Sequence, residues 1–202
     1  MRVITFCGTW HPVSANRGLL DEVTRHLRSG GATVVEFDGL DDIIPFDPQS
    51  TDDPDDDVAA MRQLVDDADA VIIAAPEYAG ALAGSTKNAL DWTVGVGSFY
   101  EKPVGVACAG TTGGHFARRD LAQTLAWHGA MVVAHLGIAA PRTKSDDRGR
   151  FTERATLDAI DAFADEVIAR AAATRAEQIA HARAIAVELG IDPERIAGGT
   201  HR

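Results

Sequence analysis

The sequence predicts an α/β protein: a three-layer sandwich whose centre is a five-stranded parallel sheet in the order 2-1-3-4-5. Short apolar runs alternate along the chain with amphipathic segments, which is typical of strands joined by helical crossovers. The runs are apolar throughout rather than at every second residue, which indicates strands buried on both faces. Because five such runs occur and no sixth, the order 2-1-3-4-5 is favoured over a six-stranded sheet built from two halves.

The first part of the chain predicts a strand, a helix and a second strand. Val3–Cys7 is a short apolar run and favours a first strand. Within Asn16–Arg28 the apolar residues recur every three or four positions, as on one face of a helix. The pair Gly30–Gly31 is typical of a helix C-terminus. We therefore expect the helix to end there and Thr33–Phe37 to form the second strand.

An acidic connection follows the second strand. Residues 38–57 contain nine Asp and three Pro. Their spacing lacks both the Asp-x-Asp-x-Asp-Gly pattern and the terminal Glu of a calcium loop, so we expect a solvated loop without a metal role. Its last residues, Asp55–Asp57, favour a helix N-terminus. Apolar positions between Val58 and Val65 then continue that helix.

The rest of the chain repeats the alternation. Apolar runs predict the third, fourth and fifth strands at Ala70–Ala75, Val104–Ala109 and Met131–Leu136. The intervening segments predict helices at Ser85–Thr93, at Gly113–His128 and over a stripe from Leu157 to Ile168.

The C-terminal part differs from this pattern. We expect one domain over residues 1–174 and a helical extension over residues 175–202, because Ile179, Ala182 and Leu189 maintain a helical stripe. The end at Gly198–Arg202 is expected to be frayed.

Charge limits the classes of partner. The formal net charge is −11 over 202 residues. Nucleic acids and anionic membranes attract clustered Lys and Arg, so neither is expected as the main partner. An anionic small ligand remains compatible, because backbone N–H groups at a helix N-terminus bind phosphate without net positive charge.

Targeting signals and cysteines indicate the compartment. No apolar run approaches the roughly 18 residues that span a bilayer, and the first residues resemble a strand more than a signal peptide. Cys7 and Cys108 lie in separate apolar runs and are expected to be buried free thiols, which suits a reducing cytoplasm. Their spacing does not fit a zinc or iron–sulfur site.

Three loops follow the first, third and fourth predicted strands and should meet at one sheet edge, where open α/β sheets bind ligands. The first loop offers phosphate donors: Thr9, His11, Ser14 and Asn16. Ser14 and Asn16 are also ordinary N-cap residues. The second loop, Pro76–Gly80, carries a Tyr, and its Gly permits close approach of a ligand. The third is the Gly-rich segment Ala109–His115.

These motifs resemble the family of NAD(P)H-dependent FMN reductases and related quinone, azo and chromate reductases, which are flavodoxin-like. The family's Gly-Ser-x-Arg-x-x-Ser-x-Asn pattern is matched in spacing by Gly8, Thr9, His11, Ser14 and Asn16. Its Pro-Glu-Tyr-Asn-Gly turn and Lys-Asn-Ala-x-Asp-Trp helix are matched by Pro76, Glu77, Tyr78, Gly80, Lys87, Asn88, Ala89, Asp91 and Trp92. Its Gly-x-x-Gly-Gly loop is matched by Gly110, Gly113 and Gly114. The resemblance covers roughly residues 1–170.

The resemblance implies FMN as cofactor, with NADPH or NADH as electron donor. It implies that Thr9, His11, Ser14 and Asn16 hold the phosphate and that Pro76, Glu77, Tyr78 and Gly80 line the isoalloxazine. Gly110, Thr111, Gly113 and Gly114 would contact the pyrimidine side of the ring. The flavin itself carries the chemistry, so no catalytic acid or base is nominated. The resemblance also implies ping-pong kinetics, in which two electrons pass to a quinone, an azo compound, free flavin or a similar acceptor.

Two departures from the family pattern bear on flavin affinity. His11 replaces the family's Arg, and a His cannot form a bidentate fork with phosphate. Ala79 stands where the family often has Asn. Both changes imply weaker flavin binding. They support one alternative, a flavodoxin-like binding or regulatory module with weak or lost FMN. A single-electron carrier of the flavodoxin type is the other alternative, although the Pro-Glu-Tyr turn and the Lys87–Trp92 helix argue against it.

The resemblance also implies assembly and a choice of donor. The helix that includes Lys87–Trp92 lies at the subunit interface of the family, which implies a homodimer or homotetramer. Trp92 fits either the core or that interface. Arg17, Arg118 and Arg119 could meet the 2′-phosphate of NADPH, although exposed helical Arg is the ordinary alternative.

Overall fold

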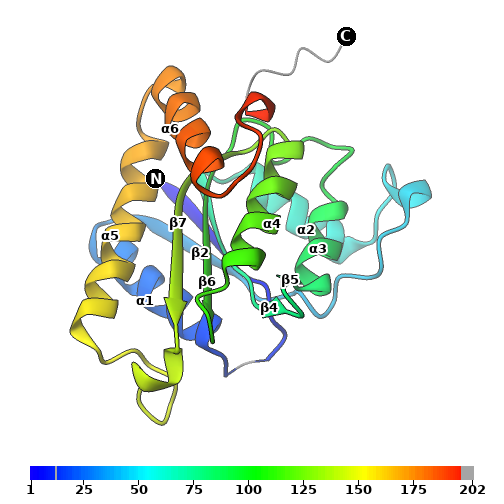
Figure 1. Ribbon diagram of the computed structural model, residues 1–202. Coiled ribbons are helices and arrows are strands. Elements are labelled where there is room, and N and C mark those ends of the chain that lie inside the picture. Colours follow the sequence, from blue (N-terminus) through cyan, green and yellow to red (C-terminus); the bar gives the residue numbers. More distant parts are fainter. Residues whose placement is uncertain (12, 197–202) are drawn as a thin grey trace.

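The structure is a computed structural model that describes residues 1–11 and 13–196. A five-stranded parallel sheet in the order β2-β1-β3-β6-β7 lies at its centre (Figure 1). The strands are β1 (Arg2–Cys7), β2 (Thr33–Phe37), β3 (Ala70–Ala74), β6 (Pro103–Gly110) and β7 (Met131–Ala139). Because β6 and β7 are the fourth and fifth strands of this sheet, the predicted order 2-1-3-4-5 is confirmed.

Parallel pairing brings the carboxyl ends of the strands to one edge. Val3 of β1 pairs with Val34 of β2 and with Ala70 of β3, so the three strands run in register. The pairing of β6 with β7 continues as far as Gly110 opposite Ala139. These two strands are therefore longer than the apolar runs alone predict, and they extend toward the loops that follow.

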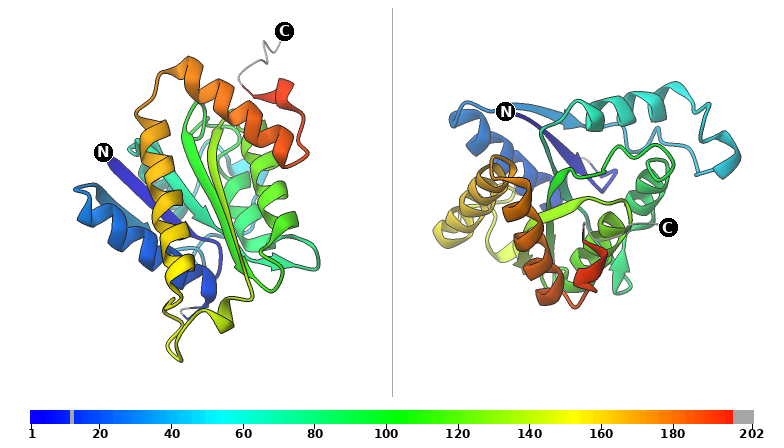
Figure 2. Two further views of the ribbon diagram at one scale, coloured as in Figure 1. Left: turned by 60° about the vertical axis from the view of Figure 1, so that its left-hand side comes forward. Right: turned by 90° about the horizontal axis from the view of Figure 1, so that it is seen from above.

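Helices cover both faces of the sheet (Figures 1 and 2). One face carries α1 (Ala15–Ser29) and α5 (Arg154–Ala171), and the other α2 (Asp56–Asp66), α3 (Gly84–Asp91) and α4 (His115–Trp127). Each face has its own apolar cluster: Ile4 and Leu121 belong to one, Val3 and Leu19 to the other. Adjacent residues of one strand thus serve opposite layers, which explains why the strands are apolar at every position.

Two helix N-termini are capped by the residues that the sequence indicates. The hydroxyl Oγ of Ser14 accepts a hydrogen bond from the N–H of Arg17 over 3.1 Å. The carboxylate of Asp55 accepts one from the N–H of Val58 over 2.9 Å. The acidic loop therefore ends as an N-cap, as predicted.

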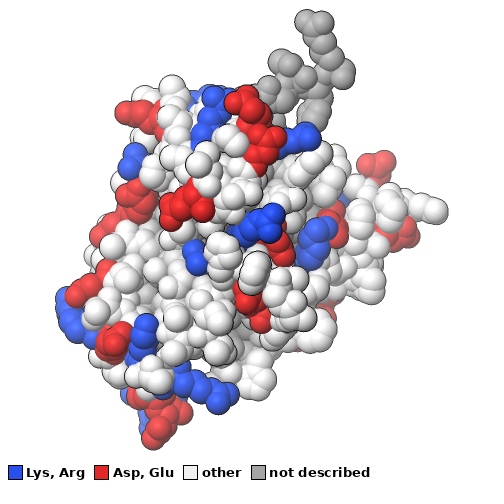
Figure 3. All heavy atoms as spheres, viewed as in Figure 1, with Lys and Arg blue, Asp and Glu red and all other residues white. Residues whose placement is uncertain are grey.

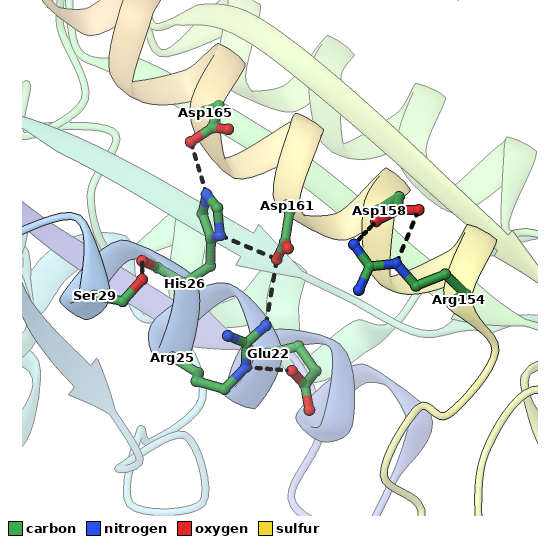
Figure 4. A network of polar contacts seen from close by, with 8 residues as sticks. All are labelled: Glu22, Arg25, His26, Ser29, Arg154, Asp158, Asp161 and Asp165. Atoms are coloured by element: carbon green, nitrogen blue, oxygen red, sulfur yellow. Dashed lines mark hydrogen bonds and ion pairs between the residues drawn. The ribbon is translucent and has the colours of Figure 1, made fainter.

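A polar network joins α1 to α5 (Figure 4). The His26 ring of α1 lies between two carboxylates of α5: Nδ1 is 3.1 Å from Asp161 and Nε2 is 2.7 Å from Asp165. Arg25 reaches Asp161 from the same side and also pairs with Glu22. These contacts fix the two helices side by side on their face of the sheet.

The C-terminal extension is helical through α6 (Arg175–Glu188). A capping box between Thr174 and Glu177 begins this helix. Ile185 and Leu189 are buried and join the apolar cluster that also contains Met131 of β7. The extension therefore covers the outer strand of the sheet. The expectation of a frayed end at residues 198–202 lies outside the described residues.

The face of the molecule seen in Figure 3 carries no large patch of like charge. There Lys and Arg side chains are interspersed with Asp and Glu rather than gathered into a patch of one sign. Among the described helices, none combines the length and the apolar character that crossing a bilayer requires. Cys7 and Cys108 are buried free thiols, as predicted.

The motif at Lys87–Trp92 has a structural role in this chain. The Asn88 amide accepts from the N–H of Phe46 over 2.8 Å and donates to the carbonyl of Ile44 over 2.9 Å. The indole N–H of Trp92 donates to the same carbonyl over 2.8 Å, and the side chain is fully buried. Trp92 therefore belongs to the core, and together with Asn88 it anchors the acidic connection to α3.

One element was not predicted. Two-residue strands β4 (Glu77–Tyr78) and β5 (Ala81–Leu82) form a separate antiparallel hairpin after β3. Both residues of its turn have positive φ, 53° at Ala79 and 72° at Gly80. A two-residue hairpin turn of this kind favours Asn-Gly. Ala at the first position is strained, because its Cβ crowds the backbone in the left-handed region.

Replacing Asn88 by Ala tests the anchoring role. Asn88→Ala should lower the free energy of unfolding by about 2 kcal/mol, because it leaves the N–H of Phe46 and the carbonyl of Ile44 without this partner. Urea denaturation provides the measurement. The control is Gln63→Ala, which removes only an exposed hydrogen bond from Gln63 to Asp67 and should change stability by less than about 0.5 kcal/mol. Equal effects of the two substitutions would contradict the role.

Replacing Ala79 by Asn tests the strain in the hairpin turn. Ala79→Asn should raise the free energy of unfolding by about 0.5–1 kcal/mol, since Asn tolerates the left-handed region better than Ala. Ala81→Asn is the matched control, because Ala81 is also exposed but lies in a strand, and it should give no gain. Thermal and urea unfolding of both variants compare them. A destabilised Ala79→Asn variant would refute the assignment of strain.

Candidate functional site

A cavity of about 570 Å³ opens at the carboxyl edge of the sheet, between the loop after β1 and the β4–β5 hairpin. Its wall combines the first two predicted loops with the start of α3. The lining residues are Gly8, Thr9, Trp10, His11, Tyr78, Ala83, Gly84 and Ser85. The structure thus brings Thr9, His11 and Tyr78 together as expected from the motifs.

The first loop is shaped by its own side chains. The hydroxyl Oγ1 of Thr9 accepts from the N–H of His11 over 3.3 Å, and Nδ1 of His11 accepts from the N–H of Val13 over 3.2 Å. Because Nδ1 accepts, the second ring nitrogen of the neutral imidazole carries the proton. The ring is exposed and leaves Nε2 available as a donor.

Helix α3 fixes the start of the first loop through two hydrogen bonds to Gly8. Both Ser85 and Thr86 donate their hydroxyls to the carbonyl of Gly8, over 3.4 and 3.1 Å. A Cβ added at Gly8 would lie 2.3 Å from Oγ1 of Thr86, so only Gly fits there. Sequence reasoning missed these two hydroxyls. Their only signal was a Ser-Thr pair directly before the Lys87–Trp92 motif.

The N-terminus of α3 also faces the cavity. Ala83 precedes the helix and provides no side-chain cap, while Ala83, Gly84 and Ser85 line the cavity wall. The backbone N–H groups of a helix's first turn lack intrahelical acceptors and carry partial positive charge. This wall is therefore suited to a polar or anionic edge of a ligand.

Asn16 has a different environment from the other first-loop residues. It is buried, and its side-chain amide forms two hydrogen bonds with the backbone of Ala109 in β6. Oδ1 accepts from the Ala109 N–H over 2.8 Å, and Nδ2 donates to its carbonyl over 3.4 Å. Its side chain therefore ties the first turn of α1 to the strand that leads into the third loop.

Glu77 and Tyr78 of the hairpin point to different partners. The Oε2 atom of Glu77 accepts from the N–H groups of Phe116 and Ala117, over 2.8 and 3.0 Å. This carboxylate caps α4, whose N-cap residue Gly114 offers no side chain. Tyr78 is 62% exposed and lines the cavity. The hairpin thus braces α4 through Glu77 and presents the aromatic ring of Tyr78 to the cavity. Pro76, which precedes the hairpin, is buried, and Gly80 lies in the hairpin turn.

The third loop, Gly110–Gly114, lies at the same sheet edge but is not among the residues that line the cavity. Gly113 and Gly114 have φ of 81° and 62°, and a Cβ at Gly114 would lie 2.1 Å from Sγ of Cys108. Thr111 is exposed, and its carbonyl accepts from the N–H of Ala140.

Burial raises the pKa of the Cys108 thiol to about 11, so this thiol is a packing group rather than a nucleophile at neutral pH.

The arrangement suits a ligand that is planar at one end and anionic at the other. Two exposed aromatic side chains, Trp10 and Tyr78, can contact a ring. Thr9, His11 and the uncapped start of α3 can donate hydrogen bonds to an anion. Within residues 1–11 and 13–196, no group of three or more His, Cys, Asp or Glu side chains could hold a metal ion.

Known proteins share this sequence and fold. Residues 1–144 match the family model of NADPH-dependent FMN reductase. An NADH:(hydroxy)cinnamate reductase subunit from Vibrio ruber is 31% identical over 128 residues, which cover 62% of each chain. An NAD(P)H:quinone oxidoreductase from Solanum tuberosum is 32% identical over 98 residues, which cover 46% of this chain and 49% of the potato protein. The matches therefore span less than two thirds of either relative.

Solved structures agree on the fold. The flavoenzyme FerB from Paracoccus denitrificans, an NAD(P)H:acceptor oxidoreductase, superposes with a TM-score of 0.68 at 22% identity, covering 83% of this chain and 97% of that one. An azoreductase from Bacillus anthracis gives a TM-score of 0.59 at 14% identity, covering 85% and 98%. At these identities the likeness concerns the flavodoxin-like fold.

The first-loop, hairpin and Gly-rich motifs, the sheet order and the family match over residues 1–144 lead to the same conclusion. This chain belongs to the NADPH-dependent FMN reductase family.

Proposed function

We propose that the cavity between the first loop and the β4–β5 hairpin binds FMN, and that the chain passes two electrons from NAD(P)H to a small planar acceptor. Bound FMN supplies the hydride-transfer chemistry, while the protein binds and orients it. The observation that carries the proposal is the cavity itself, with Tyr78 on one wall and Thr9 and His11 on another.

We assign roles to the predicted residues as follows. Thr9, His11 and Ser14 hold the phosphate, and Asn16 fixes that loop through Ala109. Pro76, Glu77, Tyr78 and Gly80 form the hairpin wall along the isoalloxazine, with Tyr78 in contact and Glu77 as its brace. Gly110, Thr111, Gly113 and Gly114 offer backbone groups to the pyrimidine side of the ring. Residues 1–174 form this FMN-binding domain, with 175–202 as an extension.

The acceptor class follows from the open, aromatic rim. Tyr78 and Trp10 are more than 60% exposed, so the cavity presents large apolar surfaces to solvent. Such a rim favours flat molecules: a quinone, an azo compound, free flavin or a similar acceptor. The relatives named above include a quinone oxidoreductase and a (hydroxy)cinnamate reductase, which supports this class. Two buried free thiols favour the cytoplasm as the compartment.

Substitution of His11 by Arg tests the phosphate position in the purified chain. We expect the wild type to bind FMN and to oxidise NADPH or NADH when benzoquinone is present. His11→Arg should lower the FMN dissociation constant about tenfold, because a guanidinium stays charged and can bond bidentately to phosphate. Fluorescence titration with FMN measures it.

His181→Arg is the control for His11→Arg, since it places a guanidinium on α6 beside Glu166 and leaves the first loop unchanged. An FMN affinity that rises equally in both variants would refute the phosphate position. A wild type that neither binds FMN nor oxidises NAD(P)H would refute the enzyme and favour the binding or regulatory module. Reduction that halts at the one-electron state would favour the flavodoxin-type carrier.

We further propose that the chain forms a homodimer or homotetramer through α3 and α4. A groove of about 460 Å³ runs between these helices, and its lining residues are Ala81, Leu82, Lys87, Asp91, Val94, Asp120, Gln123, Thr124, Trp127 and His128. Val94 and Trp127 are 59% and 61% exposed. Exposed apolar side chains around a groove are typical of an interaction surface. Of the predicted contact helix, Lys87 and Asp91 face this groove, whereas Trp92 lies in the core.

A charge placed in the groove should separate the subunits. Val94→Asp should convert the dimer or tetramer to monomers, because burying an unpaired carboxylate at an interface is costly. Sedimentation velocity measures the mass. Val187→Asp is the matched control, since Val187 is 64% exposed on α6, away from the groove, and should leave the assembly intact. A monomeric wild type, or dissociation by both variants, would exclude this interface.

A further inference from the structure

The half-buried guanidinium of Arg118 lies directly behind the third loop. Its Nε donates to the carbonyl of Gly113 over 3.2 Å, and its Nη1 lies 2.7 Å from Nδ1 of His135. A Cβ added at Gly137 would lie 2.8 Å from Nη2 of Arg118, so the strand β7 has room for this group only because Gly137 lacks a side chain. The guanidinium is therefore held in one place by the backbone of the loop and by β7.

The hydrogen-bond roles in this group are determined by chemistry. A guanidinium only donates, so Nδ1 of His135 accepts and Nε2 carries the ring proton. Nε2 lies 3.0 Å from Oε1 of Glu188 at the end of α6 and donates to it. Arg118, His135 and Glu188 thus form a chain of contacts from the third loop through the sheet edge to the C-terminal extension.

Arg118 keeps its charge without a direct acidic partner. In the described part of the chain, no carboxylate lies within ion-pairing distance of this guanidinium, and Glu188 meets it only through His135. Burial lowers the pKa of Arg118, which the Cys108 thiol, Glu188 and Glu77 oppose, and a guanidinium remains protonated at neutral pH all the same. The nearby Glu77 carboxylate is occupied by two N–H groups of α4. A positive charge therefore stands behind the loop.

We propose that Arg118 is a residue that tunes the flavin: it fixes the third loop through Gly113 and its charge stabilises reduced FMN relative to oxidised FMN. Hydride transfer moves two electrons and one proton from NAD(P)H to FMN and leaves NAD(P)⁺ together with a flavin that carries one more negative charge. A cation held near the ring favours that product. This inference rests on the proposed function, in which the third loop contacts the pyrimidine side of the ring.

The C-terminal extension contributes through Glu188. Its carboxylate orients His135, and its negative charge partly offsets that of Arg118 at a greater distance from the loop. The two residues should therefore act on the reduced flavin with opposite signs. A purely structural role would move both in the same direction, because loss of either contact would loosen the same loop.

The test measures the dissociation constant of oxidised FMN and the midpoint potential of bound FMN, by titration with dithionite against a reference dye at low ionic strength. Arg118→Gln should weaken reduced FMN about tenfold relative to oxidised FMN, which lowers the midpoint potential by about 30 mV. Arg118→Lys retains the positive charge, so its midpoint potential should lie close to that of the wild type. Arg119→Gln is the matched control, because it removes the same charge one residue away, and no hydrogen bond or ion pair joins Arg119 to the described residues.

The Glu188→Gln variant tests whether Glu188 and Arg118 shift the midpoint potential in opposite directions. Its side chain is 65% exposed, so the variant should fold, and Gln can still accept from Nε2 of His135. The midpoint potential should rise, by less than Arg118→Gln lowers it, and this measurement stands alone if Arg118→Gln fails to fold. An unchanged or lowered potential in Glu188→Gln overturns the proposal, as does an Arg118→Gln variant that matches Arg119→Gln. These outcomes leave the proposed function intact, whereas a wild type that binds no FMN overturns both.

Discussion

The buried amide of Asn16 determines how the loops of the site lie relative to one another. Its two hydrogen bonds to Ala109 join the first turn of α1 to β6, although β3 lies between β1 and β6 in the sheet. The first loop must therefore end where the third loop begins. An unsatisfied amide at this buried position would cost free energy comparable to that of the lost hydrogen bonds, so the backbone of both loops is fixed together. This contact fixes the position at which the first loop enters α1.

A second set of contacts fixes the hairpin to the same frame. Glu77 reaches the N-terminus of α4, and Ser85 and Thr86 bind the carbonyl of Gly8 from α3. Each contact joins segments that are dozens of residues apart in the chain. Several of the motif residues are thus occupied with positioning backbone, and the cavity lining presents hydroxyls, one imidazole, aromatic rings and the N-terminus of α3.

The sequence predicts the fold well because local patterns determine it: apolar runs, helical stripes and Gly after helices fixed the strand order and five of the helices on the sheet. It predicts less of the site. The β4–β5 hairpin escaped because its strands have two residues each and its turn has Ala79 where Asn is favoured. The partners of Asn16 and Glu77 escaped because they lie 93 and about 40 residues away, and no local pattern encodes such contacts. The sequence is compatible with Trp92 either in the core or at a subunit interface. Its burial and the hydrogen bond from its indole N–H to the carbonyl of Ile44 place it in the core.

The electrostatics of the site follow from these positions. Under the proposed function, a chain with net charge −11 holds an anionic cofactor, although no Lys or Arg is among the described residues that line the cavity. Arg17 pairs with Asp38, so under the proposed function His11 and backbone N–H groups would meet the phosphate. Binding of this kind depends on exact placement of dipoles rather than on total charge, because a dipole's interaction decays faster with distance than that of a full charge. If the proposed function holds, the backbone contacts at Asn16, Glu77 and Gly8 are the means by which this acidic protein places its donors around an anion.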